Sequence, residues 1–450
     1  MTPHVTGAEE PRHGTAPGAW PFLGHLPYLA VRPLAFLDSL PDHGDVVRVR
    51  MGPRTVHVVS HPALVRRVLT DRGSFDRGGV LYDKVRAVLG NGLATCSNAE
   101  HRGQRRVLQP AFHHSLMERY AAVMAAETAV VTGGWRSGAV VDVTEEAFRL
   151  TTAVAVRTLF SAGVTARAAE ELREALDVLL RGVYARVVAP ALDRVPSPAR
   201  RRYRRALARW RAGVAAIVAA YRATGVDHGD ALSLLLAVRD ERGRALSDAE
   251  LGDQVATLVL AGAETTSSVV AWALRLLADH PEVAARLHGE LDAVLGGRPV
   301  TGADLPRLPY TGDVVREVLR LYPPAWAVTR TAVRETELAG RSLPPGSLVI
   351  CCLYLVHRRH DVFRDAARFD PGRWAAGEVP RDACVPFGLG ATKCIGDVFG
   401  TVEATLALAA MASRWRMTPA SPRPPRPVPR IVLSPGPQPM LLAERGAADH

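Results

Sequence analysis

Cysteine is scarce in this sequence and follows no familiar pattern. The chain of 450 residues contains five cysteines, and none of their spacings matches the paired motifs of zinc sites. An odd number in so long a chain also argues against a disulfide framework. Because the thiolate is the form that binds metals and attacks electrophiles, one cysteine remains a candidate ligand or nucleophile.

Long apolar runs are absent as well. No stretch of the sequence approaches the roughly 20 apolar residues that cross a bilayer. The first residues, MTPHVTGAEEPRHG, contain neither an apolar segment nor a cleavage pattern, so they do not resemble a secretory signal. We therefore expect a cytoplasmic protein without a membrane anchor.

Lysine is nearly missing, although the chain is basic. Lys84 and Lys393 are the two lysines among 56 basic residues, and the formal net charge is +11. A basic chain can bind nucleic acid, but arginine and alanine are both abundant throughout, as GC-rich codons would produce. The charge alone is therefore a weak indication of function.

The densest arginine cluster is PARRRYRRALARWRAGVAAIVAAY, and clustered arginines can contact phosphate groups. On a helix, however, its apolar side chains share one face and most arginines lie elsewhere. That face comprises Tyr203, Leu207, Trp210, Val214, Ile217 and Tyr221. The pattern predicts an ordinary surface helix, and we expect no nucleic-acid partner.

Hydrophobic periodicity predicts a mainly α fold with a smaller β portion. Residues 45–60 alternate apolar and polar side chains around a Gly-Pro turn, which predicts a hairpin, and a short helix follows over 63–69. From about residue 100 to 295 the spacing of apolar residues predicts one helix after another. After residue 321 we expect short strands such as SLVICCLYLV, an irregular segment, a last helix over 394–413 and closing strands near 431–442.

The sequence shows no internal repeat and no linker between domains. We expect a flexible N-terminus over residues 1–16 and a single domain over residues 17–450. With 48% hydrophobic residues, a chain of this length can bury a large core.

A long central helix is predicted over residues 253–281, where DQVATLVLAGAETTSSVVAWALRLLADHP is apolar on nearly every side. Gly262, Glu264 and Thr265 break the rules of a buried helix, since glycine costs about 1 kcal/mol relative to alanine and a buried carboxylate needs a partner. Clustered violations of this kind are typical of functional sites. Either Glu264 reaches a surface cleft or an arginine, or the acid and the alcohol together relay protons to a ligand beside the helix.

The segment FGLGATKCIG, residues 387–396, places Cys394 among three glycines. Glycine costs about 0.5–1 kcal/mol in regular structure, so a loop this rich in glycine is shaped either for a tight turn or for a flat bound object.

Together these segments resemble the cytochrome P-450 superfamily, from Pro17 to the C-terminus. The cysteine loop matches the haem-binding pattern of the family, AGAETT resembles its oxygen-activation motif, and AEHRGQRRVLQPAF resembles its haem-contacting helix. EVLR resembles the Glu-x-x-Arg pair of the family, and FDPGRW supplies a third partner for that pair. The motifs occur in the order and at the separations usual for the family.

The resemblance implies haem (heme, iron protoporphyrin IX) between the central helix and the cysteine loop, with Cys394 as the metal ligand. A thiolate ligand pushes electron density onto iron and favours cleavage of the O–O bond, and a helix beginning at Cys394 would favour the thiolate through its dipole. The residues implied to bind the cofactor are His101, Arg105, Ala261, Arg330, Phe387, Gly388, Cys394 and Gly396.

Further roles follow from the same resemblance. Thr265 would steady bound dioxygen, and Glu264 would help to deliver protons. Glu317, Arg320 and Arg373 would form a buried charge network that is needed for folding around haem.

The sequence departs from the family at three positions. Thr392 stands where a basic residue usually binds a haem propionate, which puts one cofactor contact in doubt. His101 replaces a frequent tryptophan, and Gly372 replaces a common glutamate.

The implied activity is that of a haem-thiolate monooxygenase, which hydroxylates an apolar small molecule with two externally supplied electrons. These would come from NAD(P)H through a ferredoxin and a ferredoxin reductase, and Arg102, Arg106 and Lys393 could steer such an acidic partner. We expect a monomer.

The substrate is expected to be a compact hydrocarbon without a charged group, because the residues at family-equivalent pocket positions are apolar. These are Val80, Leu81, Val88, Leu89, Leu258, Ala325, Trp326, Ala327 and Val328. The continuation IGDVFG and Thr392 resemble bacterial sesquiterpene oxidases such as pentalenene oxygenases, which act in secondary-metabolite biosynthesis. Hydroxylation of a macrolide, steroid or fatty acid, or ligand binding by haem without catalysis, are the alternatives.

Overall fold

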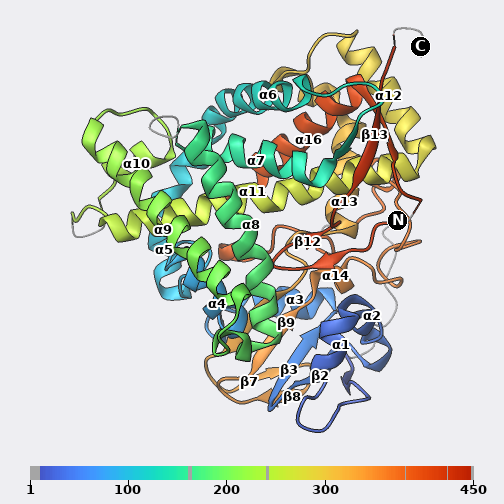
Figure 1. Ribbon diagram of the computed structural model, residues 1–450. Coiled ribbons are helices and arrows are strands. Elements are labelled where there is room, and N and C mark those ends of the chain that lie inside the picture. The colour runs from blue at the N-terminus through green and yellow to red at the C-terminus, as the bar shows by residue number, and fades with distance from the viewer. Residues whose placement is uncertain (1–10, 161–164, 240–242, 381, 423, 447–450) are drawn as a thin grey trace.

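The computed structural model describes residues 11–160, 165–239, 243–380, 382–422 and 424–446. As predicted, the fold is mainly α with a smaller β portion. Figure 1 shows most of the helices in the upper part of the molecule and a sheet with three short helices, α1 to α3, at its lower end. The long helix α11 (Asp248–Asp279) crosses the helical part.

The predicted hairpin is confirmed and belongs to a six-stranded sheet. β2 (Val46–Met51) pairs antiparallel with β3 (Arg54–Val59). The order of the sheet is β1-β2-β3-β9-β6-β4. The other strands in it are β1 (His13–Thr15), β4 (Phe75–Asp76), β6 (Val328–Ala332) and β9 (Leu348–Cys351).

Part of the predicted flexible N-terminus is ordered. Residues 1–10 lie outside the described residues, whereas His13–Thr15 pairs in parallel with the first residues of β2. Residues 13–15 therefore belong to the edge of the sheet, inside the segment that was predicted to be flexible.

The remaining strands form small sheets: β5 (Val140–Asp142), β10 (Trp415–Pro419) and β13 (Pro439–Glu444) in one, β7 (Thr336–Leu338) with β8 (Arg341–Leu343), and β11 (Val428–Pro429) with β12 (Leu433–Ser434). The other helices are α1 (Leu26–Val31), α2 (Pro33–Asp38), α3 (Pro62–Thr70), α4 (Val80–Leu89), α5 (Asn98–Leu108), α6 (Met117–Gly133), α7 (Val143–Leu159), α8 (Ala166–Val188), α9 (Pro198–Thr224), α10 (Ala231–Ala237), α12 (Pro281–Leu295), α13 (Pro309–Leu321), α14 (Leu353–Val356), α15 (Gly372–Ala375) and α16 (Asp397–Arg414).

The central helix is confirmed as α11. It begins five residues earlier than predicted because Ser247 caps it, with Glu250 completing a capping box, and it ends before Pro281. Its length and composition would allow it to cross a membrane, but 83% of its most apolar window is buried inside the fold. Since α7, α13 and α16 pack around it, α11 is the core helix that the apolar pattern predicts.

Two predicted boundaries are wrong. In SLVICCLYLV the strand β9 ends at Cys351, and Leu353–Val356 forms the short buried helix α14. A short apolar run is compatible with either structure, so periodicity could not separate them. The last helix, α16, begins at Asp397 instead of Cys394, because the loop before it contains a 3₁₀ turn and Gly396 occupies the cap position.

The arginine-rich helix α9 has the predicted amphipathic character. Trp210, Val214, Ile217 and Tyr221 are buried on one side of it. Most of its arginines are exposed.

Candidate active site

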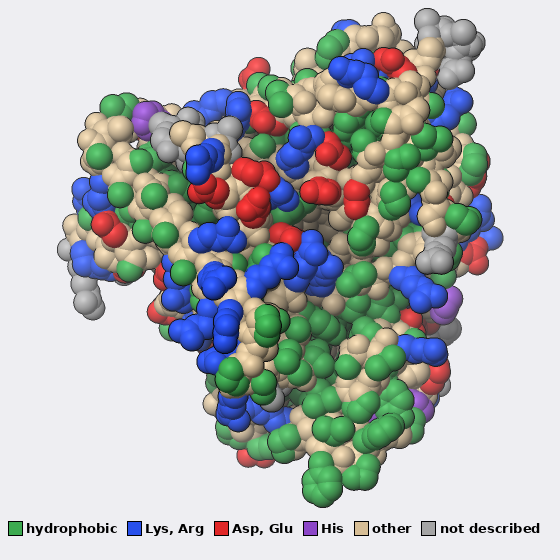
Figure 2. All heavy atoms as spheres, viewed as in Figure 1, with side chains coloured by type: hydrophobic (Ala, Val, Ile, Leu, Met, Phe, Trp, Pro, Cys, Tyr) green, Lys and Arg blue, Asp and Glu red, His purple; other side chains and the backbone are tan. Residues whose placement is uncertain are grey.

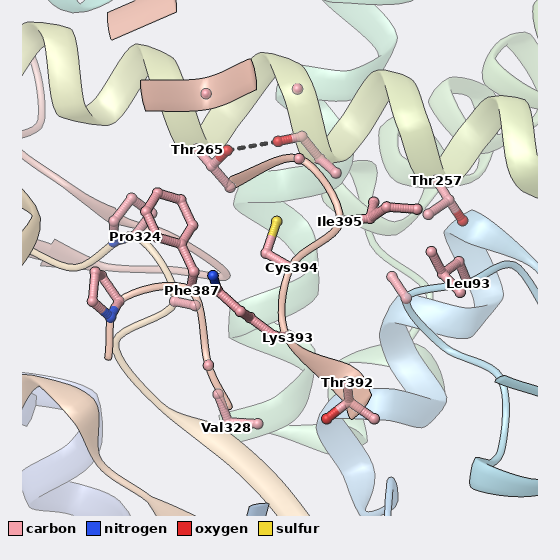
Figure 3. A pocket seen from close by; sticks show the side chains of 18 of the residues that line it. Leu93, Thr257, Thr265, Pro324, Val328, Phe387, Thr392, Lys393, Cys394 and Ile395 are labelled. Atoms are coloured by element: carbon pink, nitrogen blue, oxygen red, sulfur yellow. Dashed lines mark hydrogen bonds between the residues drawn. The ribbon is translucent and has the colours of Figure 1, made fainter. Parts of the chain in front are cut away.

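A cavity of about 330 Å³ lies between α11 and the loop that precedes α16. Ala261, Gly262 and Thr265 line it from α11, and Phe387 and Cys394 line it from the loop. Figure 3 shows the Cys394 sulfur pointing from the loop toward the part of α11 that carries Thr265. The two unusual motifs of the sequence therefore meet at one cavity.

Glycines give the cysteine loop its shape. Gly388 and Gly390 have φ angles of 72° and 65°, which residues with a Cβ rarely adopt. A Cβ on Gly390 would also lie 3.1 Å from Cγ2 of Thr70, at the end of α3. The backbone N–H of Cys394 donates to the carbonyl of Phe387 at 2.8 Å. The loop thus closes on itself and presents the thiol to the cavity.

The thiol of Cys394 is accessible from the cavity, although protein encloses that cavity on most sides. Burial raises the pKa of the Cys394 thiol, and the hydrogen bond from the backbone N–H of Gly396 lowers it only in part. α16 starts three residues later than predicted, and the backbone N–H that lowers the pKa of the Cys394 thiol belongs to Gly396, the N-cap residue of this helix. The polypeptide alone favours the thiol, so a bound metal ion would have to displace the proton.

Basic side chains line one side of the cavity. His101, Arg105 and Arg330, which the resemblance assigned to the cofactor, lie there together with Arg77. Within the described part of the chain, no carboxylate pairs with any of these three arginines. Burial and then the charge of Arg77 lower the pKa of His101 to about 4, so its imidazole is neutral. Uncompensated positive charge at one edge fits haem, whose two propionates would lie there.

On α11, small side chains leave space above Cys394. The hydroxyl of Thr265 donates to the carbonyl of Ala261 at 2.6 Å (Figure 3), so the hydroxyl lies at the edge of that space. A Cβ on Gly262 would lie 3.2 Å from Cβ of Ala155, because α7 packs closely against α11 there.

Glu264 does not line this cavity. Its carboxyl group lies in a second cavity of about 510 Å³, which charged side chains of α7, α8 and α9 and Arg430 also line. Figure 2 shows acidic and basic side chains next to one another on the face over α7 and α8. Consecutive residues of a helix point about 100° apart, so Thr265 faces the cavity of Cys394 while Glu264 faces the cavity that Arg430 lines, as in the first of the two alternatives for Glu264.

The carboxyl group of Glu264 is protonated near neutral pH. Its side chain is 8% exposed, and Oε2 has no hydrogen-bond partner among the described residues. Burial raises the pKa of Glu264 to about 8, and the charge of Arg430 opposes this shift. A buried acid with such a pKa can both give up and recover a proton.

Three of the positions predicted for the substrate pocket line the cavity of Cys394. These are Leu258, Ala325 and Val328. The other predicted positions do not line it: Val80, Leu81, Val88, Leu89, Trp326 and Ala327.

Tertiary packing explains the misplaced positions. Val88 and Leu89 are 4% and 1% exposed and pack into the core around α8 and α9. The carbonyl of Val88 accepts a hydrogen bond from Nε1 of Trp210 at 3.1 Å. Trp326 packs near the first sheet, and its Nε1 donates to the carbonyl of Arg430 at 2.9 Å.

Several lining residues were missed by the sequence analysis. On the polar side these are Arg77 and Tyr82, and on the apolar side Leu69, Leu93, Ala94, Leu159, Val269, Leu319 and Pro324. They belong to elements that carry no recognised motif. For Arg77 a signal existed in FDRGG, where two glycines directly after an arginine indicate a bend that could aim its side chain.

The three residues of the predicted charge network lie together behind the loop. Glu317 Oε1 is 2.7 Å from Nη2 of Arg320 and 2.9 Å from Nε of Arg373. All three side chains are buried. Arg320 also donates to the carbonyl of His357 at 2.8 Å, and Nε2 of His357 accepts a hydrogen bond from the backbone N–H of Val385 at 2.9 Å. The network therefore reaches the start of the cysteine loop.

Comparisons with known proteins agree with this geometry. The family model for cytochrome P-450 matches residues 15–442. The chain is 45% identical over 446 residues to cyclooctat-9-en-7-ol 5-monooxygenase of Streptomyces melanosporofaciens, covering 96% of this chain and 95% of that protein. It is 46% identical over 441 residues to cyclooctatin synthase of the same organism, covering 96% of each chain. It is 44% identical over 409 residues to pentalenene oxygenase of Streptomyces avermitilis, covering 90% of this chain and 91% of that protein.

Proposed function

Because the chain belongs to the cytochrome P-450 family and is a monooxygenase, we propose that it oxygenates a cyclic terpene, as a hydrocarbon or its alcohol, in secondary metabolism. The cavity beside Thr265 carries this proposal. Its lining away from the basic edge includes Leu258, Leu319, Ala325 and Val328, which suit an apolar substrate and offer no charge to an ionic one. The names of two relatives denote oxygenation of cyclooctat-9-en-7-ol and of pentalenene.

Haem would supply the activation of dioxygen with two electrons. Cys394 would ligate its iron through the sulfur atom that faces α11. Ala261, Phe387, Gly388 and Gly396 would contact the ring, and His101, Arg105 and Arg330 would bind the propionates.

Thr265 and Glu264 are proposed to act in sequence on protons. The Thr265 hydroxyl lies at the edge of the space above Cys394 and can hydrogen-bond to an oxygen atom placed there. Glu264 lies one residue earlier, in the polar second cavity. It can exchange protons with water in that cavity and pass them on toward Thr265, which faces the cavity of Cys394.

Electrons are proposed to arrive from a ferredoxin and its NAD(P)H-dependent reductase. A groove of about 1130 Å³ is lined by Arg72, Arg102 and Arg106, and it shares His101 and Arg105 with the cofactor cavity. An acidic partner in this groove would come close to the haem edge. Lys393, which was predicted to belong to this surface, pairs with Asp397 at 2.5 Å and does not line the groove.

We also propose that the chain acts as a cytoplasmic monomer with one domain from residue 17 onward. The family match over residues 15–442 supports the single domain, and the cytoplasmic location and the monomer rest on the sequence.

A product assay tests the proposed substrate class. The purified holoprotein is incubated with NADPH, a surrogate ferredoxin and reductase, and a panel of cyclic terpenes, macrolides, steroids and fatty acids. Products are identified by mass spectrometry, and we expect a gain of one oxygen atom on at least one terpene. Product from another class alone would overturn the proposal, and so would substrate-induced spectral changes without any product, which would indicate ligand binding only.

A further inference from the structure

We propose that one end of the molecule binds reversibly to the surface of a membrane that contains anionic lipids. The binding surface has two parts, an apolar tip over residues 17–31 and the basic start of α9 over residues 200–205. Both parts lie outside the catalytic cavity, so the inference goes beyond the proposed function and holds for any substrate.

The apolar tip exposes large side chains that folded proteins usually bury. The exposed fractions are 53% for Trp20, 91% for Phe22, 50% for Leu23, 39% for Tyr28 and 77% for Val31. Figure 2 shows hydrophobic side chains gathered at the lower end of the molecule, over α1 and the six-stranded sheet. A cluster of exposed apolar side chains indicates an interaction surface, whereas single exposed residues do not.

The backbone holds the Phe22 side chain outward. Its φ angle is 59°, in the left-handed region that a bulky residue rarely adopts. The backbone N–H of Gly52 donates to the carbonyl of Leu23 at 3.0 Å, and that of His25 donates to the carbonyl of Arg50 at 2.7 Å. The β2–β3 hairpin thus fixes the bend at Phe22. Backbone strain of this kind is common at functional sites.

The apolar tip has a positively charged rim. Residues 11–37 and 46–70 contain no Asp or Glu, whereas Arg32, Arg50 and Arg54 are exposed. Within the described residues, no carboxylate pairs with these three arginines. The rim is therefore able to attract anionic groups.

Packing places the basic start of α9 at the same end of the molecule. α1 contacts α8, and the hydroxyl oxygen of Tyr184 in α8 lies 3.5 Å from the carbonyl oxygen of Leu29. Nε of Arg186, also in α8, is 2.7 Å from Oδ1 of Asp193 in the 3₁₀ turn that follows. Because this turn leads into α9, the first residues of α9 begin on the side of the apolar tip.

The start of α9 is basic and has no acidic neighbours in sequence. Residues 194–226 contain no Asp or Glu, and α9 contains eight arginines. Arg201, Arg204 and Arg205 are exposed, and no carboxylate in the described part of the chain pairs with them. Leu192 and Val195, 43% and 55% exposed, add apolar area just before α9. Figure 2 shows basic side chains beside the hydrophobic end, on the side of α8 and α9.

An anionic membrane fits both parts of this surface. Apolar side chains enter the boundary between headgroups and acyl chains, and nearby arginines attract anionic lipids. Such binding is peripheral and needs no membrane-spanning helix. A nucleic acid would contact the arginines and leave the apolar tip exposed. In a symmetric dimer the same patch would face itself and bring its arginines together.

Vesicle sedimentation tests the apolar tip. The holoprotein is mixed at low salt with vesicles of phosphatidylglycerol and phosphatidylcholine, or of phosphatidylcholine alone. We expect wild type to bind the anionic vesicles, and Trp20→Gln/Phe22→Asn to bind them about tenfold more weakly. Asn tolerates the φ angle at position 22, so this variant should fold. Val130→Gln is the matched control and should bind like wild type, since Val130 is 69% exposed on α6, in the upper part of Figure 1.

Charge reversal tests the basic start of α9. Arg201→Glu/Arg205→Glu should bind the anionic vesicles on the order of tenfold more weakly, and wild type should bind them more weakly in high salt or when they lack phosphatidylglycerol. Arg102→Glu/Arg106→Glu changes the net charge equally on α5 and should leave vesicle binding nearly unchanged. Equal weakening by the two pairs would overturn the proposal, because net charge alone would then govern binding.

Three further results would overturn the proposal. The first is wild type that does not bind anionic vesicles at low salt. The second is equal binding by wild type and Trp20→Gln/Phe22→Asn. The third comes from sedimentation velocity without vesicles, where we expect monomers of both proteins. A wild-type dimer that this variant dissociates would show that a second copy of the chain covers the apolar tip.

Discussion

Glu264 and Thr265 are neighbours in sequence but face different cavities of the molecule. The threonine hydroxyl lies beside Cys394, where oxygen chemistry would take place, and the carboxyl group lies among charged side chains in the second cavity. Separation of this kind lets an acid exchange protons with water while the space beside the sulfur stays largely apolar.

The raised pKa of Glu264 makes stability depend on pH. The pKa of this carboxyl group is about 8 in the folded protein, whereas the ordinary value of glutamate, 4.5, applies to the unfolded chain. Between these values the folded protein holds a proton that the unfolded chain has released. The free energy of unfolding therefore falls as pH rises through this window. In Glu264→Gln this pH-dependent fall in the free energy of unfolding, on the order of a few kcal/mol, should be absent.

Urea unfolding of the holoprotein at pH 5 and pH 8 measures this difference. Glu174→Gln is a suitable control, since Glu174 lines the same cavity but its side chain is 54% exposed. If Glu264→Gln and wild type lose stability equally between the two pH values, Glu264 does not titrate in this range.

At the scale of elements, α13 connects the buried charge network with the cysteine loop. Glu317 and Arg320 lie on α13, and Arg373 lies on α15. Glu317 also accepts a hydrogen bond from Nε1 of Trp374 at 3.1 Å. Through His357, the network holds the backbone of Val385, two residues before Phe387.

Removing one member of this network should be far more damaging than removing a surface arginine of the same helix. Arg320→Ala leaves Glu317 buried with one partner fewer, and we expect a loss of about 3–5 kcal/mol in stability together with poor haem incorporation. Arg316→Ala breaks a bridge to Asp313 in which the arginine side chain is 58% exposed and the aspartate side chain 9% exposed; because water can take the place of the exposed arginine, this should cost about 1 kcal/mol, clearly less than Arg320→Ala. Haem content per protein and urea midpoints measure the losses in the two variants. Similar losses in both variants would contradict this account.

The elements and motifs were more predictable than the directions of side chains. The β2–β3 hairpin and α11 follow from alternation and apolar content, and Cys394 stands out because glycines surround it. The burial of Val88 does not follow from the sequence of α4, because contacts with α8 and α9 decide which side of α4 faces the cavity. Arg77 was missed for a similar reason, since the pairing of β4 with β6 sets its position.

On the scale of the whole molecule, part of the net charge of +11 is concentrated at the groove beside the cofactor cavity. Arg102 and Arg106 line this groove from α5, whereas Arg201 and Arg205 lie exposed on α9, away from it. The two pairs carry the same charge, so comparing them separates a local docking effect from a general one.

Charge reversal at the groove should slow electron delivery. We expect Arg102→Glu/Arg106→Glu to lower the rate of reduction by an acidic ferredoxin about tenfold at low ionic strength, with a smaller difference in high salt. Arg201→Glu/Arg205→Glu should leave the rate nearly unchanged. Stopped-flow reduction measures both, and an equal decrease in the two variants would show that net charge, not the groove, governs the encounter.

The bond from the Cys394 sulfur to haem iron is tested most directly by the absorption spectrum of the reduced protein with carbon monoxide. Wild type should show the red-shifted Soret band of thiolate-ligated haem. Cys394→Ser should lose that band, even where some haem remains bound. A wild type that purifies without haem and takes up none from added hemin would contradict the account, and so would a Cys394→Ser variant that keeps the red-shifted band.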